Sequence, residues 1–351
     1  MLDLITFGHT TTDVFLAISD AVVKCDVNHK NCQICLDYAD KIRVDSFSRA
    51  IGGNAPNTAV GASRLGLSVG VVSNIGKDAN GDFVLEVLKR EKIKDLNYIR
   101  RDSFGTDYST IINFRGERTI LAFHEKRKYV FPKKLCCAKW GYLSSMGEDF
   151  AEFNEKFLSW AKECGAKIGF NPGIYELKAG VSRIKNVLQK GDFLIVNKEE
   201  AESLVLKGSI VVNATIRDLL SGLFNLGPKT VVITDGKNGA YSYDGAEILK
   251  MDIFPGERVE MTGAGDSFSS GMLSALVYGK SVKEALRWGA ANSSSAIQKI
   301  GAIEGLLTEW NMYRILKEHS SIVPKVLYNP FDSPWDKSNT TNTLTPFNPV
   351  A

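Results

Sequence analysis

The hydrophobic positions of this chain form short continuous runs that alternate with stretches of helical spacing. The continuous runs predict buried strands at residues 4–8, 68–76, 140–145, 166–172, 192–197 and 230–236. Apolar residues at helical spacing predict helices at residues 57–67, 81–92, 152–165, 181–191, 198–206 and 266–278. Strands that are apolar throughout are typical of parallel sheets covered by helices on both faces. The pattern therefore predicts an α/β fold class with a mainly parallel sheet.

Two segments depart from this alternation. Residues 14–50 and 104–125 are strand-like, with alternating polar and apolar positions and no helix between their strands. They predict a small antiparallel β flap, or lid, added to the α/β body. From Pro324 onward the chain is rich in Pro, Asn and Thr, which predicts an irregular tail over residues 324–351. We therefore expect one domain over residues 1–323, with its lid, followed by the tail.

Composition excludes several classes of partner. Hydrophobic residues make up 44% and charged residues 24% of the 351 positions, as in an ordinary globular protein. The formal net charge of +3 is too small to indicate binding to nucleic acid or to a membrane surface. No apolar run approaches the ~20 residues that span a bilayer, and the N-terminal segment, with Asp3, is typical of a strand rather than a secretory signal. We expect a cytoplasmic protein without nucleic-acid or membrane partners.

A turn of three small residues lies directly before a carboxylate in the C-terminal third of the chain. Gly263, Ala264 and Gly265 precede Asp266, which begins a predicted helix. Unpaired backbone N–H groups at a helix N-terminus attract anions, and small residues let a phosphate approach them. An Asp in the first turn also stabilises the helix itself, so an anion site and simple capping both stay open. Neither a G-x-x-x-x-G-K-[ST] phosphate loop nor a G-x-G-x-x-G dinucleotide turn occurs in the chain.

Further motifs in the same order resemble those of one enzyme family. A first motif, G-G-x-x-x-N-x-A-x-x-x-x-x-L-G, has its residues at Gly52, Gly53, Asn57, Ala59, Leu65 and Gly66. An N-x-x-E element follows at Asn197–Glu200, a T-x-G-x-x-G-A turn at Thr234–Ala240, and then the Gly263–Asp266 turn. With the helical segment over residues 289–302, these motifs resemble the ribokinase-like (PfkB) carbohydrate kinases over roughly residues 1–310. The resemblance implies a three-layer sandwich around a mainly parallel sheet, with a small β lid.

The resemblance also implies an activity: transfer of the γ-phosphoryl group of ATP to a hydroxymethyl group of a sugar or sugar derivative. Asp266 would be the general base, and the N–H groups of Gly263, Ala264 and Gly265 the anion hole. On the nucleotide side, Asn197 and Glu200 would organise Mg²⁺ through water. The residues that would contact the nucleotide itself are Thr234, Gly236 and Asn292. On the substrate side, the hydroxyl groups of the acceptor would be bound by Asp13, Gly52, Gly53 and Asn57. The lid is also a candidate surface for a homodimer.

Alternatives stay open beside these roles. Asn197 and Glu200 are equally typical of a helix N-cap and its capping-box partner, and Asp13 of a turn after the first strand. A nucleoside kinase of the same fold fits the motifs as well as a sugar kinase does. A non-catalytic, ligand-binding descendant of the fold is the rival class, although simple binding would not require the base Asp266.

Three positions depart from the family pattern. Glu260 and Met261 replace the family's leading Asp-Thr, whose Asp helps to hold a monovalent cation in many relatives, so activation by K⁺ is left open. Thr11 stands where ribokinases have an Asn two places before Asp13, so ribose itself is not implied. The strand over residues 140–149 lacks a clear counterpart of the Glu that contacts sugar in ribokinases.

The cysteines indicate a metal site. Cys25, His29, Cys32 and Cys35 have the spacing C-x₃-H-x₂-C-x₂-C, which is typical of a structural Zn²⁺ knuckle over residues 25–35 of the lid. Unbound, reduced thiols in a polar loop are the alternative. Cys164 is interpreted as a small buried hydrophobe near a helix end. The charged run at residues 125–128 is interpreted as a solvated turn, in which Arg127 at the edge of the flap can meet a phosphate on a phosphosugar.

Overall fold

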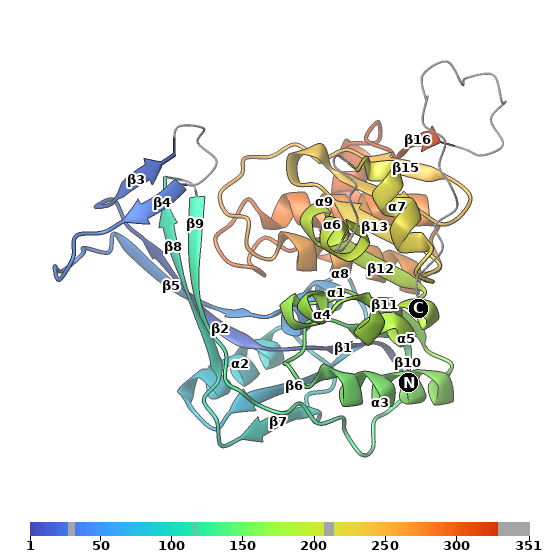
Figure 1. Ribbon diagram of the computed structural model, residues 1–351, viewed down its shortest axis with the longest axis horizontal. Helices are drawn as coiled ribbons and strands as arrows, with labels where there is room; N and C mark the ends of the chain where they lie inside the picture. Colours follow the sequence, from blue (N-terminus) through green and yellow to red (C-terminus); the bar gives the residue numbers. More distant parts are fainter. Residues whose placement is uncertain (27–31, 116, 207–213, 329–351) are drawn as a thin grey trace.

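The structure is a computed structural model that describes residues 1–26, 32–115, 117–206 and 214–328. In this part of the chain a ten-stranded sheet forms the centre of the body (Figure 1). In spatial order its strands are β16 (Lys325–Tyr328), β15 (Ile248–Met251), β14 (Ala240–Tyr243), β13 (Val231–Thr234), β12 (Phe193–Asn197), β11 (Lys167–Phe170), β10 (Ala138–Leu143), β1 (Leu2–Phe7), β6 (Val69–Gly76) and β7 (Ile99–Asp102).

The sheet is parallel from β7 to β13 and antiparallel from β13 to β16. All eight residues of β6 and nearly all of β1 are buried, because helices cover both faces of these central strands. The mainly parallel sheet that the continuous apolar runs predicted is therefore confirmed.

Helices form a layer on each face of the sheet, and each layer has its own hydrophobic core. On one face lie α1 (Asn54–Arg64), α2 (Ala79–Arg90), α8 (Ala264–Val277), α9 (Val282–Ala296) and α10 (Glu309–Glu318). On the other face lie α3 (Phe150–Cys164), α4 (Ile174–Ala179), α5 (Val181–Lys190), α6 (Lys198–Leu206) and α7 (Ile216–Phe224). A short 3₁₀ turn, η1 (Gly236–Asn238), lies between β13 and β14. Over the described ranges, no helix combines the length and the hydropathy that crossing a bilayer requires.

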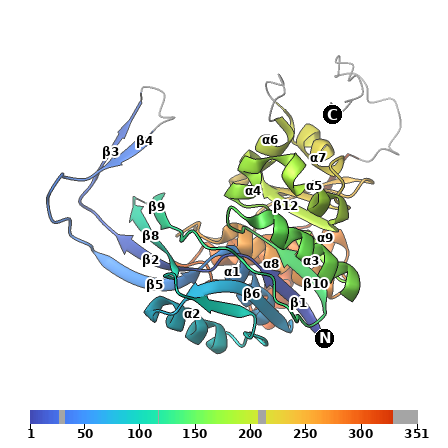
Figure 2. The ribbon, with the colours of Figure 1, turned by 60° about the horizontal axis from the view of Figure 1, so that its bottom comes forward.

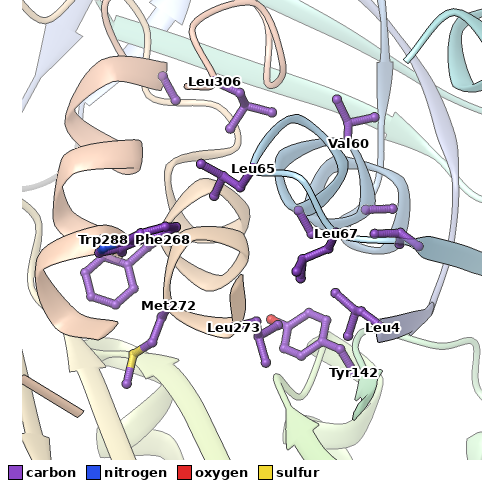
Figure 3. Close-up of a cluster of buried hydrophobic side chains, with 14 of the residues drawn as sticks. Leu4, Val60, Leu65, Leu67, Tyr142, Phe268, Met272, Leu273, Trp288 and Leu306 are labelled. Carbon is purple, nitrogen blue, oxygen red and sulfur yellow. The ribbon is translucent and has the colours of Figure 1, made fainter. Parts of the chain in front are cut away.

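Most of helix α8 is buried: all residues from Asp266 to Ala275 lie in the interior of the first layer. Its side chains Phe268, Met272 and Leu273 pack among residues of the sheet, of α1 and of α9, including Trp288 (Figure 3). Small residues permit this packing: a Cβ on Gly61 of α1 would collide with the side chain of Ser270. The Ser270 hydroxyl donates to the Ser267 carbonyl at 2.9 Å, so the buried polar group is satisfied.

The lid is a separate four-stranded sheet in the order β5 (Ser46–Gly52), β2 (Thr11–Ala17), β8 (Asp107–Phe114), β9 (Glu117–Phe123). The β2–β5 and β8–β9 pairs are antiparallel, as expected, whereas the central β2–β8 pair is parallel. A small hairpin of β3 (Val22–Cys25) and β4 (Cys32–Cys35) projects beyond this sheet, away from the body (Figure 2).

The zinc knuckle expected in this hairpin is not what the structure shows. Cys25 and Cys32 are directly opposed neighbours of the antiparallel β3–β4 pair and form a disulfide. Cys35 lies at the other end of the hairpin, opposite Val22, and is a free thiol. Because residues 32–35 are an extended strand and not a tight turn, Cys32 and Cys35 point to opposite faces. His29 lies outside the described residues.

The other cysteines also differ from expectation. Cys137, at the start of β10, forms a disulfide with Cys164 at the end of α3, so Cys164 is not a simple buried hydrophobe. Cys136 is a free thiol. Among the described residues, no group of three or more His, Cys, Asp or Glu side chains is placed to hold a metal ion.

The expected tail begins with a strand. Residues Lys325–Tyr328 form β16 and pair with β15 at the edge of the large sheet, and residues 329–351 lie outside the described part. The predicted boundary at residue 324 therefore falls just before the last strand of the body.

We predict that Gly141→Ala lowers the free energy of unfolding by about 1–3 kcal/mol through overpacking. Gly141 lies in β10 between β1 and β11, and a Cβ there would be 2.7 Å from Trp160 and 2.8 Å from Phe157 of α3. Urea unfolding measures the effect. The matched variant Gly141→Ala/Phe157→Leu should lose less than the sum of the two single changes, since the smaller ring leaves room for the methyl group. Strict additivity would contradict this account.

Candidate active site

The three small residues form the start of α8, as the sequence predicted. Gly263 is the N-cap and adopts the left-handed conformation with φ 75°. A Cβ on Gly263 would lie 2.5 Å from the Cβ of Ala302, so both conformation and space require glycine here. A Cβ on Gly265 would meet nothing within 4 Å and would project into open space. The first turn of α8 therefore presents bare backbone to a cavity.

We call this space the turn cavity. It lies between the β13–β14 turn, the loop before α8 and the α8–α9 pair, and its lining includes Thr234, Gly236, Ala264, Gly265, Phe268, Ser293 and Ser294. Two of the residues predicted to contact nucleotide, Thr234 and Gly236, thus face the same cavity as the Gly263–Gly265 turn. A helix N-terminus at one wall makes this cavity suited to an anionic ligand.

Asn292 is not where the resemblance placed it. This side chain is fully buried at the α8–α9 contact and does not line the turn cavity. Its amide donates to the Ser267 carbonyl at 2.9 Å and to the Ser270 hydroxyl at 3.0 Å, and its oxygen accepts from the Leu307 N–H at 2.9 Å. Since these bonds occupy its polar groups, the role of Asn292 is to fix α9 against α8, while the neighbouring Ser293 and Ser294 face the cavity.

Asp266 is buried in the first turn of α8, and both of its oxygens accept hydrogen bonds from α1. Asn54 donates to Oδ1 at 2.8 Å, and Asn57 donates to Oδ2 at 2.9 Å. Burial raises the pKa of the Asp266 carboxyl, and the two amide donors oppose this shift. The carboxylate is thus held in a fixed position, and each oxygen keeps a lone pair for a further donor.

The Gly52–Gly53 pair lets the lid strands and α1 approach Asp13. Asp13 of β2 is buried and accepts a hydrogen bond from the Thr11 hydroxyl at 2.8 Å. A Cβ on Gly52 would collide with the Asp13 carboxylate, and a Cβ on Gly53, which has φ 96°, would collide with the His9 carbonyl. Burial raises the pKa of Asp13, and the negative charges of Asp266 and Glu260 add to the rise.

A second space, which we call the lid cavity, opens between the lid and the carboxyl ends of the parallel strands. Its volume is about 660 Å³, and its lining includes His9, Asn54, Phe104, His124, Lys126, Asn171, Tyr175 and Glu200. Asn54 both lines this cavity and holds Asp266, whereas Ala264 and Gly265 beside Asp266 line the turn cavity. Asp266 therefore lies between residues that line the two cavities, with Asn54 on the side of the lid cavity and Gly265 on the side of the turn cavity.

A charged cluster supports the lid wall of this cavity. Asp107 of β8 bonds to the His124 ring at 3.0 Å and to the Arg127 guanidinium at 3.0 Å. Arg127 also pairs with Asp102 at 3.1 Å, and its side chain is 1% exposed. The predicted solvated turn is therefore wrong at Arg127, which is a buried structural cation. The bond to Asp107 raises the pKa of His124, while burial lowers the pKa of His9, whose ring lies edge-on to it at 5.5 Å.

Asn197 and Glu200 form a reciprocal capping box at the start of α6. The Asn197 N–H donates to Glu200 Oε2 at 2.9 Å, and the Glu200 N–H donates to Asn197 Oδ1 at 2.8 Å. Glu200 also lines the lid cavity, and burial raises its pKa. The capping interpretation is thus confirmed, and the second carboxylate oxygen of Glu200 and the second lone pair of Asn197 Oδ1 lie outside the capping bonds.

Sequence reasoning missed Asn54 and His124. Asn54 stands three places before Asn57, and this spacing puts both amides on one face of the first turn of α1. The signal was therefore present in the segment that carries the Gly pair. His124 comes just after β9, and only the pairing of β8 with β9 brings it to Asp107.

Comparison with known proteins agrees with this geometry. A family model described as pfkB family carbohydrate kinase matches residues 15–309. The ATP-dependent 6-phosphofructokinase of Thermoanaerobacterium thermosaccharolyticum is 26% identical over 289 residues, which are 78% of this chain and 87% of that protein. The nucleoside kinase of Methanothermobacter thermautotrophicus is 27% identical over 266 residues, 71% of this chain and 79% of that protein.

The fold is also that of solved structures. The ribokinase of Arabidopsis thaliana, solved in complex with ribose and ATP, superposes with a TM-score of 0.74 and 21% identity, covering 90% of this chain and 99% of that one. The three-layer body and the small lid sheet are thus a ribokinase fold. Since the family model spans most of the sequence, the chain belongs to the pfkB family of carbohydrate kinases and is a phosphotransferase with an alcohol group as acceptor.

Proposed function

We propose that this enzyme transfers the γ-phosphoryl group of ATP to a hydroxymethyl group of a sugar or sugar derivative. The observation that carries the proposal is the place of Asp266, a buried carboxylate directly preceded by Gly265, which lines the turn cavity, and held by Asn54, which lines the lid cavity. A donor nucleotide in the first space and an acceptor alcohol in the second would meet at this carboxylate.

The residues around Asp266 match the demands of phosphoryl transfer. The acceptor oxygen attacks the γ-phosphorus, its proton passes to the Asp266 carboxylate, and the bond to the β–γ bridging oxygen breaks to release ADP. The N–H groups of Gly263, Ala264 and Gly265 would stabilise the negative charge on the moving group, because they lie at a helix N-terminus. The Ala264 N–H would exchange its 3.3 Å bond to the Met261 carbonyl for one to the phosphoryl group. Asn54 and Asn57 hold the base in place.

Mg²⁺ is the metal that this reaction needs, since it neutralises charge on the ATP phosphates. Asn197 and Glu200 fit an indirect role: the second carboxylate oxygen of Glu200 and the second lone pair of Asn197 Oδ1 lie outside the capping bonds, and oxygen ligands reached through water suit Mg²⁺. Thr234 and Gly236 would contact the nucleotide in the turn cavity.

The acceptor side is built around Asp13. Its carboxylate and the Gly52–Gly53 backbone would hold substrate hydroxyls, with Asn57 beside them. A nucleoside is the second candidate acceptor, because the rings of His9, Phe104 and Tyr175 line a lid cavity large enough for a base as well as a sugar. The use of ATP agrees with the expected cytoplasmic location.

The outer face of the lid supports the expected homodimer. Leu16, Phe47, Leu121 and Phe123 lie on the face opposite Asp13, according to the register of β2, β5, β8 and β9. Phe47 is 67% exposed, and Leu121 and Phe123 are each 57% exposed. Several exposed apolar side chains on one face of a sheet are typical of a protein–protein contact.

An ATP-consumption screen tests the function. We expect turnover with at least one member of a panel of pentoses, hexoses, their phosphates, 2-keto-3-deoxy sugar acids and nucleosides. Asp266→Asn should lower kcat by on the order of 10²–10⁴, because the amide keeps the shape but takes no proton. ATP affinity, measured by calorimetry, should change little.

Two outcomes would contradict this proposal. ATP binding without turnover on any acceptor would favour a non-catalytic, ligand-binding protein. Activity of Asp266→Asn within a factor of about three of the unmodified enzyme would exclude Asp266 as the base.

The pH dependence should report the burial of Asp266. A general base acts when deprotonated, so kcat/KM should fall as pH falls through a pKa raised above the ordinary 3.8. Asn54→Leu removes a donor that lowers this pKa, so the acid limb should move to higher pH. Since Asp13 and Glu200 also have raised pKa values, an acid limb that stays in place in Asn54→Leu would assign it to one of them.

The oligomeric state tests the lid contact. Sedimentation velocity should show a dimer for the unmodified protein and a monomer for Phe47→Glu, because a charge would be buried unpaired in the contact. Trp310→Glu is the matched control: Trp310 lies on α10, is 71% exposed, and should leave the dimer intact. A monomeric unmodified protein, or a dimeric Phe47→Glu, would remove the lid from the interface.

A further inference from the structure

The loop before the catalytic turn holds a buried carboxylate with one unused oxygen. The side chain of Glu260 is 3% exposed. Its Oε1 accepts from the Thr262 N–H at 2.8 Å and from the Thr262 hydroxyl at 2.5 Å. Its Oε2 is buried and has no hydrogen-bond partner in the described part of the chain. Because an unpaired buried charge is costly, this carboxylate needs a donor or a cation.

Glu260 also adds to a concentration of negative charge. Burial raises the pKa of Asp13, and the negative charges of Asp266 and Glu260 add to this rise. Within the described ranges, the cation within ion-pair distance of Glu260 is Arg118, whose Nε lies 3.9 Å from Oε1. Arg118 belongs to β9 of the lid, not to the body.

The register of the lid aims Arg118 toward the site. Arg118 pairs with Asn113 of β8, which pairs with Ala17 of β2. Ala17 lies four places after Asp13 along β2, so Arg118 and Asp13 project from the same face of the lid. A separation of 3.9 Å is ionic contact but not a hydrogen bond, and an approach of about 1 Å would let the guanidinium donate to the carboxylate.

Glu260 is linked to the anion hole through hydrogen bonds to Thr262. Thr262, which holds Oε1 through two hydrogen bonds, directly precedes Gly263, and the Ala264 N–H donates to the Met261 carbonyl at 3.3 Å. The carboxylate therefore ties together the turn whose N–H groups face the nucleotide. A shift of Glu260 would shift those groups.

These residues do not fit the resident monovalent cation that the family resemblance implies at this carboxylate. Thr262 already donates twice to Oε1, and the Arg118 guanidinium, 3.9 Å from that oxygen, would repel a K⁺ ion at the unpaired Oε2. The side chain is also one methylene longer than the Asp of the family pattern.

We propose that Arg118 is a positioning residue for phosphoryl transfer: its guanidinium, carried by the lid, is the counter-cation of Glu260 and takes the place of a bound monovalent cation behind the anion hole. The proposal rests on the proposed kinase function of the Gly263–Gly265 turn. Because Arg118 belongs to the lid, the Gly263–Gly265 turn is fully supported only when β9 lies against the loop that holds Glu260. Closing the lid over the acceptor is thereby coupled to ordering of the N–H groups that face the nucleotide.

The test compares Arg118→Gln, which removes the charge, with Arg118→Lys, which keeps it. Arg43→Gln is the control, because Arg43 is an exposed lid cation, 86% accessible, away from the site. Steady-state rates are measured in K⁺, Na⁺ and choline chloride at constant ionic strength. The unmodified enzyme and Arg43→Gln should have equal kcat in the three salts to within about twofold.

Arg118→Gln should lose about tenfold in kcat in choline, the rate equivalent of one charged contact, and should recover most of it in K⁺. Arg118→Lys should restore activity without K⁺. Adding Glu260→Gln to Arg118→Gln should abolish the K⁺ response, because no carboxylate is left to attract the ion. Strong K⁺ activation of the unmodified enzyme, or an Arg118→Gln enzyme unchanged in choline, would overturn the proposal.

A readout without turnover separates this proposal from the kinase function. Hydrogen–deuterium exchange over residues 255–265 should be independent of K⁺ in the unmodified protein. In Arg118→Gln the segment should exchange faster in choline and regain protection in K⁺. If no acceptor supports turnover, this pattern would still hold. Exchange that is unchanged by the substitution would refute the role of Arg118 even in an active kinase.

Discussion

The burial of helix α8 is the constraint on which the rest of the site depends. The helix packs closely against α1 and α9 because small residues stand at the contacts: Gly61 faces Ser270, and a Cβ on Gly271 would lie 2.6 Å from the Trp288 carbonyl. Close packing of this kind leaves little freedom to slide or rotate. It therefore fixes the N-terminal turn of α8 opposite the first turn of α1, where Asn54 and Asn57 meet Asp266.

Electrostatics around that turn follows from the same burial. The side chains of Asp13, Asp266 and Glu260 are all buried, and different partners offset the cost of burying each carboxylate. Asp13 receives hydroxyl donors from Thr11 and Ser109, and Asp266 receives two amides. Glu260 alone faces a full charge, and that charge comes from a different sheet. Neutral donors from the lid and from α1 thus serve Asp13 and Asp266, and a lid cation approaches Glu260.

The sequence alone was sufficient to predict those strands and site residues that depend on one continuous segment of the chain. The buried strands, the glycines at 52, 53, 263 and 265, and Asp266 were all predictable, because local backbone demands and apolar runs specify them. Asn292 was misplaced because its environment depends on how α9 rotates against α8, which the motif does not encode. The prediction of a zinc site from the cysteines was wrong for a similar reason. The register of β3 against β4 places Cys25 opposite Cys32, and the spacing of residues along the chain does not determine that register.

The contact between Gly52 and Asp13 has a consequence for how such an enzyme can diverge. Since any side chain at position 52 would collide with the Asp13 carboxylate, neither residue can change alone without losing the other's geometry. Mutational change toward a new acceptor is therefore restricted at Asp13 and Gly52. It falls instead on rim positions such as His124 and Lys126, which are solvent-accessible and carry no backbone requirement. The paired geometry of Asp13 and Gly52 would then persist while the lining of the lid cavity changes around it.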